Sequence, residues 1–491
     1  MLIAEPQNTA TLLTTFSILL GVSALFGRGF ERLGIPVVLA FLAIGVLAGY
    51  HAIGDLHFKD YHFAFRVGVV ALVIILFDGG LNTPYNSLKR IFFPAVTLAT
   101  LGVVITAATV TGVARLIGLP WSESLLLGAV VSSTDAAAVF SVLRGTRTQL
   151  NHRVATTLEV ESGVNDPVAM LLTIAITEQI LSGNSTSITF LIGLAILELL
   201  IGCAVGAAVA YGGRWLLSKY HPPTGGLVAV ATLALAMFAF GAGSFLHGSG
   251  FVAVYVAAVG LGNGPIPMRG SVIRFHDAFG WLSQITMFLL LGLLAHPGRV
   301  AAQVPTGLIL ALALTFLARP IAALLCLTPY RYGLRESFYV GWVGLRGAVP
   351  IVLAIFPMLA GVPGSERVFD IVFVIVIVTS LIPGSTVRWA TRKFGLEEES
   401  PPPPGAVLQI EAGQPLDAEL LSFYVTPAIA VAGAQLADLP FPEGAAVSMI
   451  VRGASLIPPR GSTVLEPGDH VYVITRPEDL TEIQLLFGRP E

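Results

Sequence analysis

The chain has 491 residues, of which 55% are hydrophobic and 12% are charged. An ordinary soluble domain carries about 25% charged residues, so this composition excludes a soluble globular protein and indicates a polytopic membrane protein. The net charge of −3 favours neither nucleic acid nor an acidic molecule as a partner.

Apolar runs long enough to cross a bilayer recur along the first 390 residues. They predict an all-α membrane domain of thirteen spanning helices. The expected spans are 9–27, 35–50, 63–80, 91–114, 123–143, 154–179, 188–211, 224–243, 249–263, 278–295, 305–328, 335–358 and 368–390. Several of these runs are short, notably 249–263, which leaves a count of twelve as the alternative.

The Lys and Arg residues of the loops predict the orientation, because cytoplasmic loops carry the excess of them. One set of alternate loops holds sixteen such residues and the other set holds five. We therefore expect a multi-pass protein of the bacterial inner membrane, with the N-terminus outside and the C-terminus in the cytoplasm.

The composition changes after the last span. Residues 396–405 include Glu397-Glu-Glu-Ser-Pro-Pro-Pro-Pro-Gly405, and a proline-rich segment of this kind behaves as a semi-rigid spacer. Beyond it, 446–451 and 470–474 are typical of strands and 477–487 of a helix. The sequence thus predicts a transmembrane domain over 1–395, a linker over 396–405 and a small cytoplasmic α/β domain over 406–491.

The sixth apolar run contains the densest group of polar side chains. Glu161 and Asn165 are four residues apart, as are Ser162 and Asp166, so each pair shares a helix face. Ionisable groups at bilayer depth are costly, and by default they mark an ion or proton path. The alternative is a buried capping or salt-bridging cluster.

Two other runs are interrupted. Ser132-Ser-Thr-Asp135 breaks the fifth run, and Gly341-Trp-Val-Gly-Leu-Arg-Gly-Ala-Val-Pro350 breaks the twelfth. Two interrupted helices in corresponding places of two halves indicate a transporter site. The offset of seven spans predicts inverted repeats, spans 1–6 and 8–13. For the twelfth run alone, the alternative is that its glycines only allow close helix packing.

Basic residues also lie at membrane depth. Arg319 and Arg346 both need a compensating charge, and Glu161 is the natural partner for one of them. Such a pair would leave Asp135 and Asp166 free to exchange ligands. Which arginine pairs with Glu161 is open from the sequence.

Asp78 stands near the predicted cytoplasmic end of the third span, close to Asn82 and Lys89. It is a candidate for an entrance funnel, with a helix-end residue as the equal alternative.

The motifs Ser132-Ser-Thr-Asp135, Glu161-Ser-Gly-Val-Asn-Asp-Pro167 and Gly344-Leu-Arg-Gly-Ala-Val349 together resemble those of the NhaP-like monovalent cation:proton antiporters, cation:proton antiporter family 1. The likeness extends over roughly residues 10–390. It implies a homodimer in which a six-helix core domain moves against a dimerisation domain. It also implies that Asp166 binds cation and proton alternately, while Glu161 pairs with an arginine. The implied site comprises Asp166, Asp135, Thr134, Ser162 and Asn165.

The run 456–473 resembles a second family, the C-terminal regulator-of-K+-conductance domain, also called TrkA-C. This resemblance implies paired ligand sensors that take a small nucleotide. NAD binding is not expected, because no Gly-x-Gly-x-x-Gly follows a strand in the linker region. Such an appendage is similar to that of the potassium:proton branch, which favours K+ over Na+.

The sequence therefore predicts an electroneutral antiporter that exchanges K+, or alternatively Na+, for H+ in pH homeostasis under control of the cytoplasmic domain. The expected partners are the transported ions, membrane lipid and a second copy, with no nucleic acid, and no cofactor is expected beyond the transported cation. A ligand-gated channel would need a filter such as Thr-Val-Gly-Tyr-Gly, and a larger solute would need a roomier polar site. An enzyme is disfavoured because no zinc or Ser/His/Asp motif stands out.

Overall fold

The computed structural model describes residues 16–25, 36–50, 60–145, 148–183, 188–219, 224–398, 418–427, 431–453 and 455–488, with the single residues 10, 13, 14 and 429. The chain separates into two compact units, a larger one that contains most of the membrane helices and a smaller one that contains the C-terminal sheet, and each is described by itself. Residues 399–405 of the predicted linker and residues 406–417 lie outside the described part.

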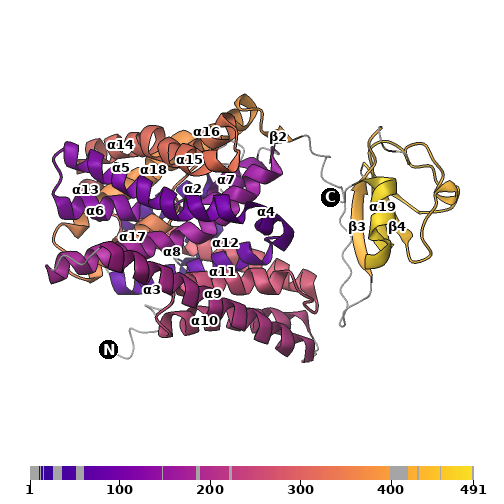
Figure 1. Ribbon diagram of the computed structural model, residues 1–491, viewed down its shortest axis with the longest axis horizontal. Helices are drawn as coiled ribbons and strands as arrows, with labels where there is room; N and C mark the ends of the chain where they lie inside the picture. Colours follow the sequence, from indigo (N-terminus) through magenta and orange to yellow (C-terminus); the bar gives the residue numbers. More distant parts are fainter. Residues whose placement is uncertain are drawn as a thin grey trace. The chain divides into compact units, whose positions relative to one another are not determined.

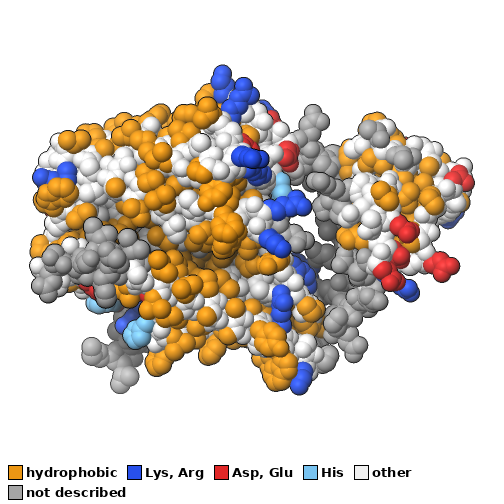
Figure 2. Space-filling model, viewed as in Figure 1, with side chains coloured by type: hydrophobic (Ala, Val, Ile, Leu, Met, Phe, Trp, Pro, Cys, Tyr) orange, Lys and Arg blue, Asp and Glu red, His pale blue; other side chains and the backbone are white. Residues whose placement is uncertain are grey.

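Helices occupy the predicted apolar segments (Figure 1). After a short helix, Phe16–Leu25, they are α2 (Val37–Tyr50), α3 (Tyr61–Leu81), α4 (Tyr85–Thr97), α5 (Val103–Leu116), α6 (Trp121–Val130), α7 (Ala136–Gly145), α8 (His152–Ser182), α9 (Ile188–Lys219), α10 (Gly225–Phe245), α11 (Gly250–Gly262), α12 (Arg269–Leu294), α13 (Pro297–Ala302), α14 (Val304–Ala313), α15 (Arg319–Leu327), α16 (Leu334–Trp342), α17 (Val349–Leu359) and α18 (Ser365–Lys393). In the described part of the chain, eight continuous helices are long and apolar enough to cross a membrane. Figure 2 shows hydrophobic side chains over much of the visible face of the helical part. The polytopic, mostly helical architecture is thus confirmed, while the count of thirteen spans stays a prediction.

Two helices are broken where the sequence indicated. Residues 131–135 separate α6 from α7, and residues 343–348 separate α16 from α17. Backbone groups freed by a helix break must find partners inside the protein, and the two breaks supply partners to each other. The amide of Asp135 donates to the carbonyl of Leu345 at 2.9 Å, and the Nε atom of Arg346 donates to the carbonyl of Val131 at 2.7 Å.

Two π-helical turns interrupt long helices. One, Leu98–Gly102, joins α4 to α5, and the other, Leu314–Ala318, joins α14 to α15. Turns of this kind frequently mark functional sites, and Arg319 follows the second one directly. They lie in the fourth and eleventh predicted spans, so they repeat the offset of seven shown by the broken helices. The inverted arrangement of the two halves remains a prediction.

A short two-stranded sheet ties the start of α8 to the end of α18. Strand β1 (Gln149–Leu150) pairs antiparallel with β2 (Glu397–Glu398). Asn151 caps α8 by accepting from the amide of Arg153 at 3.1 Å. The Nδ2 atom of the same residue donates to Glu398 Oε1 at 2.8 Å. The residues that lead toward the C-terminal domain are therefore bonded to the first turn of α8.

The C-terminal domain is an antiparallel sheet covered by a helix. Its strands are β3 (Glu419–Tyr424), β4 (Ala446–Arg452), β5 (Ser455–Ile457) and β6 (Asp469–Thr475), in the order β3-β6-β4-β5, and its helix is α19 (Leu480–Phe487). The core includes Phe423, Ile450, Val471 and Phe487, which alternate inward from the strands and the helix. The two predicted strands and the helix are confirmed, whereas β3 and β5 were not predicted from the sequence.

Candidate cation site

Asp166 lies in the middle of α8 with 9% of its surface exposed. The hydroxyl of Ser133, from the break in the α6–α7 helix, donates to Asp166 Oδ1 at 2.6 Å. Asp166 is also within electrostatic range of Asp135, Glu161 and Arg346. The α6–α7 break therefore supplies the short hydrogen bond made to this carboxylate.

Asp135 stands at the N-terminus of α7, where a carboxylate is favoured by the helix dipole. Its Oδ1 atom accepts from the amide of Ala138 at 3.1 Å, so the side chain acts as a helix cap. The other oxygen faces the α16–α17 break so closely that a Cβ atom on Gly347 would overlap it. The glycine at 347 thus makes room for the Asp135 carboxylate.

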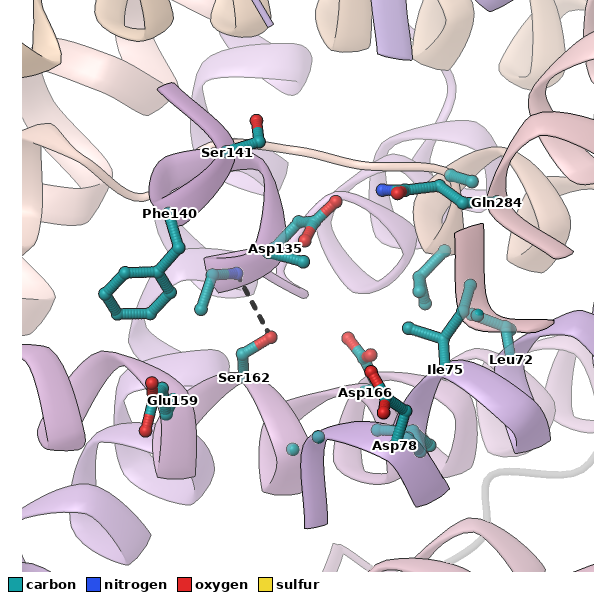
Figure 3. A pocket seen from close by; sticks show the side chains of 18 of the residues that line it. Leu72, Ile75, Asp78, Asp135, Phe140, Ser141, Glu159, Ser162, Asp166 and Gln284 are labelled. Carbon is teal, nitrogen blue, oxygen red and sulfur yellow. Dashed lines mark hydrogen bonds between the residues drawn. The ribbon is translucent and has the colours of Figure 1, made fainter. Parts of the chain in front are cut away.

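Polar side chains of α8 hold the α6–α7 break in place. Ser162 Oγ donates to the carbonyl of Thr134 at 3.0 Å and lies 3.2 Å from the amide nitrogen of Ala136, which donates to it (Figure 3). Asn165 Nδ2 donates to Thr134 Oγ1. The Oδ1 atom of Asn165 is buried and has no hydrogen-bond partner in the described part of the chain.

Glu161 is paired with Arg319. Their closest contact, Arg319 Nη1 to Glu161 Oε1, is 2.8 Å, and both side chains are 1% exposed. A second contact joins Arg319 Nη2 to Glu161 Oε2 at 3.3 Å. The pair is therefore bidentate, the arrangement in which arginine and carboxylate interact most strongly.

Arg346 has a different environment. Besides the bond from its Nε atom to the carbonyl of Val131, its Nη1 atom donates to the carbonyl of Gly344 at 2.6 Å. Val131 immediately follows α6, so this cation lies at a helix C-terminus, where the dipole favours positive charge. Arg346 therefore holds the two breaks together through backbone carbonyls.

A cavity of about 360 Å³ opens beside Asp166. Five carboxylates line it. Figure 3 labels four of them, namely Asp78 of α3, Asp135 just before α7, and Glu159 and Asp166 of α8. The fifth is Asp277 of α12. No Lys or Arg occurs among the described residues that line this cavity. A cleft lined by charge of one sign concentrates counter-ions, so the cavity is suited to attract cations.

The packing on another side of Asp166 is apolar. A void of about 10 Å³ there is lined by Asp166 and by Phe65, Val69, Leu72, Leu76, Met170, Phe251, Val349, Val352 and Leu353. That volume is near the minimum for one water molecule. Asp166 thus lies between an acidic cavity and a nearly closed apolar contact.

The structure groups the predicted residues in two sets. Asp166, Asp135, Ser162 and Asp78 line the cavity, whereas Thr134, Asn165, Glu161, Arg319 and Arg346 lie behind it and brace the breaks and α8. Asp78 also receives a 3.4 Å hydrogen bond from Asn82 Nδ2 to its Oδ1 atom.

Two of the lining carboxylates were not predicted from the sequence. Glu159 precedes Asp166 by seven residues, or two helical turns, so helical spacing could have found it. Asp277 lies in the polar first half of α12, just before the predicted span 278–295, and only the tertiary fold brings it to the cavity.

Comparisons with known proteins concern the family and the fold. The sequence matches the family model described as "Sodium/hydrogen exchanger, transmembrane" over residues 19–393 and that of the TrkA-C domain over residues 420–488. It is 38% identical over 480 residues to the K(+)/H(+) antiporter NhaP2 of Shewanella oneidensis, covering 96% of this chain and 82% of that protein. It is 27% identical over 418 residues to the Na(+)/H(+) antiporter NhaS2 of Synechocystis, covering 82% of this chain and 74% of that protein.

The fold is similar to that of a solved structure, the sodium proton antiporter MjNhaP1 from Methanocaldococcus jannaschii. The TM-score is 0.67, with 79% of this chain and 99% of that chain covered at 23% identity. The resemblance predicted from the three motifs and the tail is confirmed. Because the family match covers most of the helical part, the chain belongs to the sodium/hydrogen exchanger family of transmembrane cation:proton antiporters, which are transporters and not enzymes.

Proposed function

We propose that the protein exchanges K+ for H+ across the bacterial inner membrane by alternating access, and that Asp166 binds the cation and the proton in turn. The position of Asp166 carries this proposal. It is reached from an acidic cavity of about 360 Å³ on one side and closed by apolar packing on another. A carboxylate that one side alone can load is what alternating access requires.

The groups around Asp166 suit an alkali cation. Hard cations take oxygen ligands, and Ser133, Ser162 and Asp135 present such oxygens near the carboxylate. Asn165, which the family resemblance includes in the site, lies behind the cavity and supports the site by donating to Thr134 Oγ1. A proton on Asp166 would remove the negative charge that holds the cation, so the two substrates compete for it.

The ratio of cations to protons exchanged depends on how many carboxylates of the site can bind the two in turn. Glu161 is neutralised by Arg319, and Asp135 caps α7 with its Oδ1 atom. We therefore assign Asp135 a supporting role and count Asp166 as the single exchanging carboxylate. One proton against one monovalent cation gives electroneutral exchange.

The remaining carboxylates of the cavity form an entrance funnel. Three of them come from helix ends that meet at this cavity. Asp78 is near the end of α3, Glu159 is in the first turns of α8, and Asp277 is in the first turns of α12. We place these ends in the cytoplasm and the N-terminus outside, because the loops on that side carry most of the loop Lys and Arg residues. The funnel therefore faces the cytoplasm in this conformation.

We assign a regulatory role to the C-terminal domain, acting in a homodimer and binding a small nucleotide. The support is the TrkA-C match over residues 420–488 and the β1–β2 sheet, which connects the start of the linker to the first turn of α8. Regulation of this kind requires that the ligand bind two transport states with different affinity.

Everted membrane vesicles provide the test. After acidification, addition of K+ should restore the fluorescence of a trapped pH dye, and Rb+, Na+ and Li+ should be compared at equal concentration. Preference for Na+ would favour the alternative substrate suggested by the similarity to NhaS2. Cation flux through proteoliposomes without a matching proton flux would replace the antiporter proposal with a channel.

A further inference from the structure

A second, larger cavity lies on the other side of α8. Its volume is about 990 Å³, and its walls come from α4 and α8 on one side and from α9 and α11 on the other. The lining is mostly apolar and includes Leu88, Phe92, Val160, Leu200 and Val256. We call this cavity the α4–α9 groove. It is separate from the acidic cavity, although Gly163 and Tyr255 line both.

One end of the α4–α9 groove is polar and positive. Arg214 is the only charged residue among the described residues that line it, and it lies close to the ends of α9 and α11. Its Nη2 atom donates to the carbonyl of Gly260, while its Nε atom is buried without a hydrogen-bond partner in the described part of the chain. Lys89 and Arg90 are exposed on the first turns of α4. The start of α4 lies against the end of α11, because the amide of Tyr85 donates to Asn263 Oδ1 at 2.8 Å.

We propose that the α4–α9 groove binds an anionic phospholipid, with the phosphate at Arg214 and an acyl chain along the apolar walls. Ile196 and Leu200 are 52% and 61% exposed on α9, a helix long and apolar enough to cross the bilayer, so the groove is accessible to lipid. Arginine recognises phosphate through charge-assisted hydrogen bonds. The positive end, including Lys89 and Arg90, favours a lipid with net negative charge over a zwitterionic one.

The position of the groove gives the lipid a route to the transport site. Tyr255 of α11 packs on Gly163 of α8 so closely that a Cβ atom added at Gly163 would lie 2.9 Å from the ring. Gly163 follows Ser162 and precedes Asp166 by three residues. A lipid in the groove therefore contacts the place where α8 packs against α11. Binding of the lipid would affect any movement of α8 during exchange.

The experiment uses the full chain and two matched pairs of variants. Arg214→Gln removes the positive end, and Lys219→Gln makes the same change five residues later on α9 without altering the groove lining. Ala207→Trp fills the groove, whereas Ala208→Trp adds the same ring at an exposed neighbour outside the lining. Binding of phosphatidylglycerol and of phosphatidylcholine to delipidated protein is measured by native mass spectrometry. Exchange is measured in phosphatidylcholine vesicles with and without phosphatidylglycerol.

We expect the wild type and both controls to retain phosphatidylglycerol in preference to phosphatidylcholine. Arg214→Gln should bind it about tenfold more weakly, as the loss of a charged hydrogen bond implies, and Ala207→Trp should bind neither lipid well. The exchange rate of the wild type should depend on phosphatidylglycerol, and that of the two groove variants should not. Equal retention of the two lipids by the wild type, or wild-type retention by both groove variants, would overturn the proposal. Loss of exchange in every vesicle would count against the proposed function instead.

Discussion

Two buried carboxylates on α8 have opposite environments although they are five residues apart. Glu161 is held by Arg319 in a bidentate pair with 1% exposure on each side chain, so its charge is neutralised within the protein. Asp166 is held by the hydroxyl of Ser133 and borders a cavity. A charge that a cation or a proton can neutralise from the cavity is available for exchange, and a charge neutralised by a fixed guanidinium is not.

Asp166→Asn should abolish exchange while the protein still inserts and dimerises, because the variant keeps the size of the side chain and loses the exchangeable carboxylate. Glu159→Gln is the matched control, since it removes a carboxylate from the same cavity two helical turns away and should leave exchange in place at reduced cation affinity. Asp135→Asn should impair exchange without abolishing it. Cation-driven proton flux by Asp166→Asn above that of empty liposomes would contradict the assignment.

The pairing of Glu161 is testable by thermal unfolding in detergent. Removing one partner of a buried pair costs ~3–5 kcal/mol because the other charge is stranded, so Glu161→Ala and Arg319→Ala should each destabilise the protein strongly. Their double variant should be less destabilised than the sum, whereas Glu161→Ala and Arg346→Ala should be nearly additive. If the losses of stability of Glu161→Ala and Arg319→Ala simply add in the double variant, the contact between the two residues does not contribute to stability.

Competition at Asp166 also predicts a pH dependence. Below the pH at which this carboxylate is half protonated, each further pH unit removes about nine tenths of the unprotonated form, so the apparent affinity for K+ should weaken about tenfold per unit. Half-saturating K+ concentrations, measured in proteoliposomes with the same pH on both sides, provide the check. A half-saturating concentration that is independent of pH would exclude a shared site.

The broken helices are the elements that the sequence predicted best. Ser132-Ser-Thr-Asp135 and the glycines around Arg346 disrupt apolar runs, and local composition was sufficient to find both breaks. The contact between them was not predictable, because the amide of Asp135 and the carbonyl of Leu345 are more than two hundred residues apart in sequence. The π-helical turns were missed for a different reason: they occur within apolar helices whose composition does not change.

Gly347→Ala tests how closely the two breaks fit. The added Cβ atom would overlap the Asp135 carboxylate, and overpacking of this kind costs ~1–3 kcal/mol, so the variant should lose exchange and some thermal stability. Gly112→Ala is the control, because Gly112 lies in α5 with open space around its Cβ position. A Gly347→Ala protein with wild-type exchange would show that the Asp135 carboxylate can move away without consequence.

For the whole molecule, the sequence indicated the family, the two-part architecture and the candidate cation site, because each depends on a local motif or on composition. It left open which arginine pairs with Glu161, since both arginines lie more than 150 residues away from it and only packing decides. It also missed the β1–β2 sheet, whose strands are two residues long and carry no alternating pattern. Short pairings between distant segments are set by the tertiary fold.

The β1–β2 sheet predicts different effects for two truncations of the C-terminal part. A chain ending at Glu398 keeps β2, whereas one ending at Gly395 loses Leu396, which is 8% exposed and packs in the cluster that contains Leu150 and Val154. The longer chain should retain coupled exchange with a changed dependence on nucleotide or pH, because only the rest of the linker and the C-terminal domain are removed.

The shorter chain should in addition be less stable by ~2–5 kcal/mol, the usual cost of deleting a buried leucine. It should also transport with altered K+ affinity, because Asn151 at the start of α8 loses its bonds to Leu396 and Glu398. Melting temperature in detergent and flux in proteoliposomes measure the two effects. If the two truncations behave alike, β2 plays no part in positioning α8. If the longer one keeps the full-length profile under every nucleotide and pH tested, the C-terminal domain is a passive clamp between two copies and not a regulator.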